Sequence, residues 1–114
     1  MDELVDQIAA QAGLERATAR TAVGIVINFL SREGPADKVS ALLDKLPGAR
    51  ALAGEQDRAS GGLLGVFNDL TAIGLGMSKV QGLTRAFIAF SRAKVGDAAV
   101  DDVVNGIPGL RQFV

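Results

Sequence analysis

The segment GLGMSK, residues 74–79, has the composition of a helix start that binds an anion. Two glycines precede Ser78 and Lys79, and the backbone N–H groups at the start of a helix can hold a phosphate. The spacing differs from that of a P-loop, which needs four residues between its glycines and a strand before them. We prefer to interpret the segment as a glycine helix stop followed by Ser78 as an N-cap. Anion contact by Ser78 and Lys79 is the alternative.

An arginine follows a Pro-Gly pair at two places in the chain. Arg50 comes after Pro47-Gly48, and Arg111 comes after Pro108-Gly109. Two arginines in equivalent surroundings would suit a pair of anion sites. A guanidinium just beyond a helix end can also hydrogen-bond the last free carbonyl groups of that helix, and we prefer this structural interpretation.

Asp97, Asp101 and Asp102 form the third candidate group, a cation site. A calcium loop needs oxygen ligands at alternating positions, and residues 98–100 interrupt that pattern. The helix dipole favours acidic residues in a first turn, so we predict a helix start here. The chain has no His and no Cys, which removes the commonest general base and every thiolate metal site. We therefore predict a protein that is not an enzyme, with no catalytic residue, no cofactor and no metal.

The elements that position these residues follow from a repeat at an offset of 61 residues. Between positions 13 and 52, 8 of 40 residues are identical to the residue 61 positions later, where roughly 2 or 3 identities are expected by chance. The identical pairs are Gly13/Gly74, Leu14/Leu75, Ile27/Ile88, Phe29/Phe90, Val39/Val100, Pro47/Pro108, Gly48/Gly109 and Arg50/Arg111. The pattern predicts a single domain, 1–114, with repeat 1 over about 1–52, a linker over 53–61 and repeat 2 over about 62–114.

Each repeat is expected to contain three helices. The spacing of apolar residues predicts helices over about 2–12, 15–33 and 35–46, and again over 63–73, 78–94 and 97–107. The middle helix of repeat 1 contains AVGIVINFL, residues 22–30, which is apolar on nearly every side, as in a helix surrounded by protein. We predict a compact all-α six-helix bundle in which two tandem three-helix repeats pack about a pseudo-twofold axis through their middle helices.

Three parts of the sequence resemble known proteins. They are residues 32–49 (REGPADKVSALLDKLPGA), the glycine-rich middle and the terminal residues 107–114 (IPGLRQFV). The chain resembles small bacterial proteins of the domain-of-unknown-function families 2267 and 2780. The resemblance covers most of the chain and implies an α-helical bacterial domain. It implies no activity and no catalytic residue.

Composition narrows the range of partners. The net charge is −1 and there is no long basic run, so nucleic-acid binding is not expected. The longest uncharged stretch of the first half, residues 21–31, is about half the length of a bilayer span. The acidic N-terminus also differs from the basic start of a signal peptide. We expect a cytoplasmic protein without a transmembrane segment.

Two classes of function remain. The first is a non-enzymatic protein–protein interaction or scaffold domain that binds a protein partner or a second copy of itself, consistent with a mean hydropathy of +0.27. Its candidate surface is Leu63, Leu64, Val66 and Phe67, which would also suit a peripheral membrane contact. Packing of this face into the core is the interpretation we prefer. The alternative function is a small apolar-ligand or lipid-binding domain with a cavity between the two repeats.

Overall fold

The computed structural model describes residues 2–54 and 62–107, and these form helices without any strand. The helices are α1 (Asp2–Ala12), α2 (Arg16–Glu33), α3 (Ala36–Asp44), α4 (Ala49–Gly54), α5 (Gly62–Ala72), α6 (Met77–Val95) and α7 (Asp97–Asn105). The prediction of an all-helical chain is confirmed. The prediction of six helices is wrong, because α4 is a seventh.

Glycine ends α1 and α5 in the same way. Gly13 has a φ of +66° and Gly74 has a φ of +99°, backbone conformations that glycine adopts without strain. Beyond each glycine, a backbone N–H reaches back to the helix: Leu14 N–H donates to Ala9 O at 2.9 Å, and Leu75 N–H donates to Leu70 O at 3.0 Å. These bonds satisfy carbonyl groups that the end of a helix leaves free, so both predicted stops are correct.

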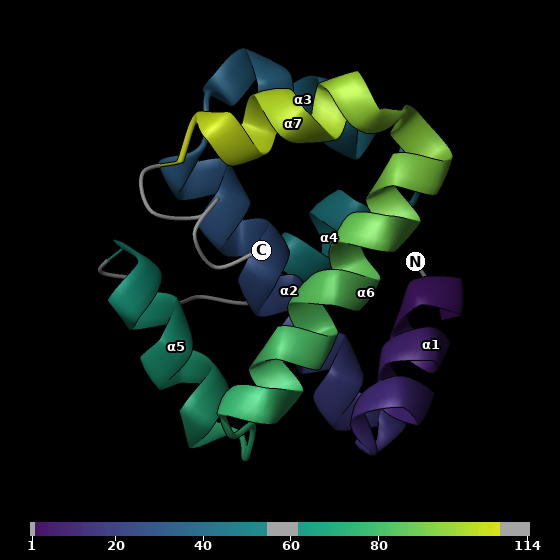
Figure 1. The fold of residues 1–114 in the computed structure, drawn as a ribbon, viewed down its shortest axis with the longest axis vertical. Helices are drawn as coiled ribbons and strands as arrows, with labels where there is room; N and C mark the ends of the chain where they lie inside the picture. The colour runs from purple at the N-terminus through teal and green to yellow at the C-terminus, as the bar shows by residue number, and fades with distance from the viewer. Residues whose placement is uncertain (1, 55–61, 108–114) are drawn as a thin grey trace.

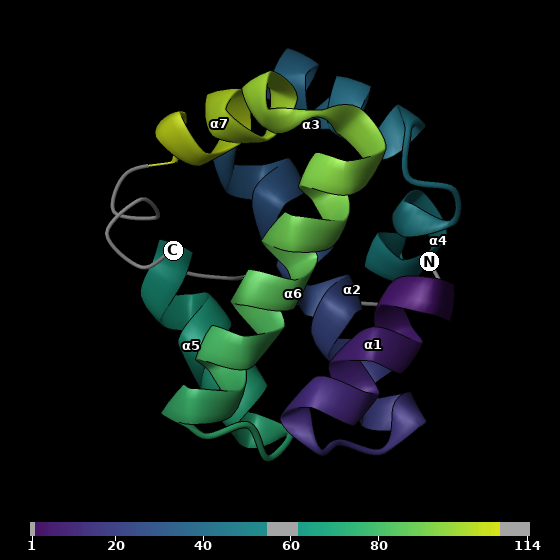
Figure 2. The same ribbon diagram turned by 45° about the vertical axis from the view of Figure 1, so that its right-hand side comes forward.

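α3 and α7 each bury one apolar stripe. In α3 the stripe is Val39, Leu42 and Leu43, and it continues to Leu46 beyond the helix end. In α7 it is Val100, Val103 and Val104, continued by Ile107. Residues three and four apart lie on one face of a helix, so each stripe forms a continuous apolar surface. α3 and α7 pack against each other and lie together at the top of the view in Figures 1 and 2.

α4 is the element that the sequence analysis missed. Pro47-Gly48 ends α3 but does not end the packed structure, because Gly48, with a φ of +86°, turns the chain into a new helix. Ala49 and Leu52 of this helix are buried, at 0% and 2% exposure, and α4 packs against α2. The predicted linker 53–61 therefore begins too early, since Ala53 and Gly54 belong to α4. Residues 55–61 lie outside the described part of the chain.

α2 and α6 run through the middle of the molecule and contact each other. α1 packs against α6 and α2 on one side, and α5 packs against α2 on the other, as Figures 1 and 2 show. The radius of gyration is 12.5 Å, close to the roughly 13 Å typical of a compact domain of this length. None of the helices in the described ranges has both the length and the apolar character that a bilayer crossing requires.

Candidate functional site

An apolar cavity of about 50 Å³ lies between α2, α5, α6 and α7. Its walls come from Val26, Phe29 and Leu30 of α2, Leu42 of α3, Val66, Phe67 and Leu70 of α5, Val80, Thr84, Phe87, Ile88 and Ser91 of α6, and Val100, Val103 and Val104 of α7. Both halves of the chain therefore contribute to it. Val26, Phe67, Thr84 and Ile88 remain partly exposed, so the cavity reaches the molecular surface.

Helical spacing explains why α6 supplies so much of the wall. Val80, Thr84, Phe87 and Ser91 follow each other at intervals of four, three and four residues, which places their side chains along one face of a helix. α5 and α7 present shorter stripes of the same kind. The cavity is thus bounded by the apolar faces that amphipathic helices turn inward.

Ser91 is the polar exception in this lining. It is 1% exposed, the only buried polar side chain among the described residues, and its Oγ has no hydrogen-bond partner among them. Serine in a helix often returns a hydrogen bond to the carbonyl group one turn earlier, as Thr84 Oγ1 does in the same helix by donating to Val80 O at 2.9 Å. A buried hydroxyl without a partner destabilises a fold by about 1–3 kcal/mol, so Ser91 marks a position where a partner is missing.

The candidate partner surface divides between the cavity wall and the exterior. Val66 is 6% exposed and Phe67 is half-buried, and both line the cavity. Leu64 points away from the core and is 74% exposed. The side chain of Leu63 lies outside the described part of the structure. The structure therefore brings two of the four residues to a site between the helices, where they contribute apolar surface.

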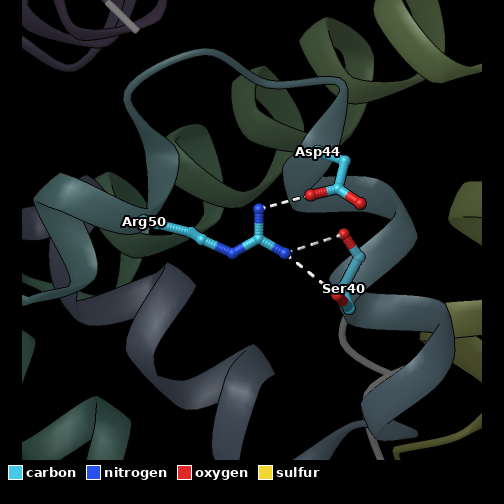
Figure 3. Close-up of polar contacts among 3 residues, drawn as sticks. All are labelled: Ser40, Asp44 and Arg50. Atoms are coloured by element: carbon cyan, nitrogen blue, oxygen red, sulfur yellow. Dashed lines mark hydrogen bonds and ion pairs between the residues drawn. The ribbon is translucent and has the colours of Figure 1, made fainter.

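Arg50 is held by α3, as Figure 3 shows. Its Nη2 donates to Ser40 O at 3.2 Å and to Ser40 Oγ at 2.9 Å, and its Nη1 donates to Asp44 Oδ1. The guanidinium thus joins the first turn of α4 to α3 through Asp44 and Ser40, and the one carbonyl group that it bonds lies a full turn before the end of α3. Arg111 lies outside the described residues.

Ser78 and Lys79 belong to the first turn of α6, which begins at the bottom of the view in Figure 2, whereas α4, the helix of Arg50, lies higher on the right. Gly76 is the N-cap of α6, so the predicted N-cap role of Ser78 is wrong. Because glycine has no side chain, the N-cap residue Gly76 gives the first turn of α6 no side-chain hydrogen bond. Ser78 is exposed, and Lys79 Nζ donates to Gly13 O at 3.5 Å. Of the three described anion candidates, Ser78 and Lys79 thus lie on α6 and Arg50 lies on α4.

The three aspartates of α7 are bound by basic side chains. Arg92 contacts Asp97 at 3.3 Å and Asp101 at 2.8 Å, and Lys38 contacts Asp102 at 3.6 Å. The hydrogen bond to Asp101 is the main reason why the pKa of Arg92 lies above its ordinary value. Within residues 2–54 and 62–107, no group of acidic side chains is arranged to hold a metal ion.

Ser91 was not among the residues predicted from the sequence, although the offset of 61 residues contains a signal for it. The residue 61 positions earlier is Leu30, and most neighbouring pairs at this offset are both apolar. A serine that replaces leucine in such a stripe places a hydroxyl inside a core. The chain matches no protein-family model, no curated protein and no solved structure, so its resemblance to the two families of unknown function stays a prediction.

Proposed function

We propose that this protein is a non-enzymatic binding domain whose cavity takes a small apolar ligand. The observation that carries the proposal is an apolar cavity whose one buried hydroxyl, Ser91 Oγ, lacks a partner among the described residues. Binding sites for small molecules commonly combine an apolar lining with few polar groups and lie between the helices of a bundle.

The size of the cavity limits the ligand. An engineered apolar protein cavity of about 150 Å³ stays dry and binds benzene, and the cavity here is about 50 Å³. The partly exposed lining residues Val26, Phe67, Thr84 and Ile88 surround its opening. The expected ligand is therefore a molecule with a short hydrocarbon chain or a single ring, which widens this opening slightly on entry. A whole phospholipid is too large.

We also propose that the cavity arises at the interface of two tandem repeats. Backbone hydrogen bonds in turns and helix ends support this, because several recur at an offset of 61 residues. They are Leu14→Ala9 with Leu75→Leu70, Ala19→Glu15 with Val80→Gly76, Val39→Pro35 with Val100→Gly96, and Leu46→Leu43 with Ile107→Val104. The packing of α1 on α6 and of α5 on α2 supports a pseudo-twofold relation in the same way.

Titration with benzene tests the binding proposal. We expect the amide signals of residues that line the cavity to shift in ¹H–¹⁵N spectra, with a single dissociation constant. Benzene at ten times that constant should add about 1.4 kcal/mol to the free energy of unfolding. The variant Ser91→Leu, which fills the cavity, should lose the effect. Leu64→Ala, outside the cavity, should retain it.

Two results would overturn the proposal. The first is the absence of saturable shifts at the cavity of the full chain. The second is benzene binding that occurs only in a chain shortened to end at Ile107, because residues 108–114 would then be the natural occupant.

Self-association is a second candidate function, supported by the exposure of Leu64. Leu64 is 74% exposed and Met77 is 58% exposed, the two large hydrophobic residues most open to solvent among the described residues. They lie near opposite ends of α5, at its start and just beyond its end. Light scattering across micromolar concentrations tests this candidate: a dimer that Leu64→Ser dissociates supports it, and a strict monomer rejects it.

A further inference from the structure

The polar groups of the cavity differ in the hydrogen bonds that they can still make. Thr84 Oγ1 donates its hydrogen to Val80 O, which leaves only oxygen lone pairs for a ligand. Ser91 Oγ has no partner among the described residues, so it retains one donor and two acceptor positions. Ser91 is therefore the only described group in the lining that can donate a hydrogen bond to a ligand without breaking another.

The charge of the lining restricts the ligand further. No charged side chain lines the cavity among the described residues. Arg92 follows Ser91 in the sequence, but it is held by Asp97 and Asp101 at 3.3 Å and 2.8 Å. A carboxylate or an ammonium group in the cavity would lose its water without gaining a counter-ion, which is strongly unfavourable.

The position of Ser91 fixes which end of a ligand is polar. Thr84 and Ser91 are separated by seven residues on α6, about 10 Å along the helix axis. The apolar side chains Phe87 and Ile88 lie between them in the wall. A ligand that bonds to Ser91 consequently has its apolar body against Phe87 and Ile88.

We propose that the natural ligand is a short uncharged molecule with an apolar body and one terminal oxygen, an alcohol or a carbonyl compound, whose oxygen hydrogen-bonds to Ser91 Oγ. This inference rests on the proposed binding function and adds to it the charge, the polarity and the orientation of the ligand. The partner that Ser91 lacks is supplied by the oxygen of the ligand.

Four six-carbon probes test this inference on the full chain: hexane, 1-hexanol, hexanoate and hexylammonium. Because Ser91 Oγ can hydrogen-bond the hydroxyl group of 1-hexanol and has nothing to bond in hexane, Ser91→Ala should weaken the binding of 1-hexanol by roughly 2- to 10-fold. Hexane should bind Ser91→Ala at least as tightly as the natural chain, which also shows that the variant is folded. Hexanoate and hexylammonium should bind at least about tenfold more weakly than 1-hexanol.

Ser31→Ala is the matched control. Its hydroxyl lies on the exposed surface of α2 and does not line the cavity, so its removal should leave the ratio of the 1-hexanol and hexane dissociation constants unchanged. The inference is overturned if Ser91→Ala leaves that ratio unchanged, or if hexanoate or hexylammonium binds more tightly than 1-hexanol. In either case binding of hexane would leave the proposed function intact. Failure of both hexane and 1-hexanol to bind would instead reject the proposed function itself.

Discussion

The two central helices, α2 and α6, differ in how completely their neighbours cover them. Ala19, Val23 and Ile27 of α2 are all 0% exposed. Sixty-one positions later on α6, Val80 is buried, but Thr84 and Ile88 keep partial exposure and line the cavity. α4 packs against α2, and the residues 61 positions after those of α4 lie outside the described part of the chain.

This difference shows how similar helices can border a closed core in one place and a cavity in another. On α2, against which α4 packs, the side chains of Ala19, Val23 and Ile27 are apolar and fully buried. On α6 the chain has a threonine and a serine at positions that are valine and leucine on α2. Most buried hydroxyl groups in proteins have a hydrogen-bond partner. The comparison of α2 with α6 therefore draws attention to Ser91, whose Oγ has no partner among the described residues and which lies in the lining of the cavity.

The largest expected effect separates Ile27 from Ile88. Ile27→Ala should lower the free energy of unfolding by about 2–5 kcal/mol, because it leaves a void in a closed core. Ile88→Ala should lower it by only about 1 kcal/mol, since Ile88 already borders a cavity and lacks neighbours on that side. Urea denaturation of both variants measures the difference. Equal losses would show that α6 is covered as completely as α2.

A pair of glycines tests where the bundle has room. A Cβ atom at Gly106 would lie 2.5 Å from Cγ and Cδ of Pro35, so Gly106→Ala should destabilise the protein by about 1–3 kcal/mol through overpacking between α3 and α7. A Cβ atom at Gly82 in α6 meets nothing within 4 Å. Gly82→Ala should therefore add about 0.5–1 kcal/mol. Thermal unfolding of both variants provides the test, and a stabilising Gly106→Ala would contradict the close contact.

Ser91→Ala should stabilise the ligand-free protein, because it removes a buried hydroxyl that has no partner. The control is Ser31→Ala, an exposed position in α2, which reports the helix propensity of alanine alone. In urea denaturation, we expect Ser91→Ala to raise the free energy of unfolding by about 1 kcal/mol more than the control does. A loss of stability relative to Ser31→Ala would mean that Ser91 already has a partner in the folded chain.

The smallest expected effect concerns the contact of Arg50 with α3. Its ion pair with Asp44 is solvent-exposed, with about half of each side chain accessible or more, so Arg50→Ala should cost only about 0.2–1 kcal/mol. The loss should shrink in 1 M NaCl because salt screens exposed charges. Arg85→Ala, on the exposed face of α6, is the control. An Arg50→Ala loss that salt does not change would assign the effect to packing instead of charge.

The sequence predicted the long helices well because their signals are local. The stops at Gly13 and Gly74 depend on the freedom of glycine to adopt a positive φ, and the buried stripes of α3 and α7 follow from residue spacing. α4 was missed because six residues give too little periodicity, and because a Pro-Gly pair usually ends a packed unit. Only the contact of Ala49 and Leu52 with the rest of the core makes that segment a helix of the fold.

The site was less predictable than the fold. Val66 and Phe67 were identified as apolar, but the sequence could not distinguish a partner surface from a cavity wall, because both require the same residues. Two of the anion candidates have contacts within the fold: Arg50 is bonded to α3, and Lys79 is bonded to the carbonyl of Gly13. Which charges meet depends on contacts between residues far apart in the chain.

By itself, the sequence determined the all-helical fold class, the glycine stops after α1 and α5 and the absence of His and Cys chemistry, because these depend on residue type and nearest neighbours along the chain. Only the tertiary structure decided that one face of α6 is incompletely covered and that Ser91 is enclosed there without a partner among the described residues. Burial and hydrogen-bond satisfaction are properties of the packed helices together, and no single helix contains them.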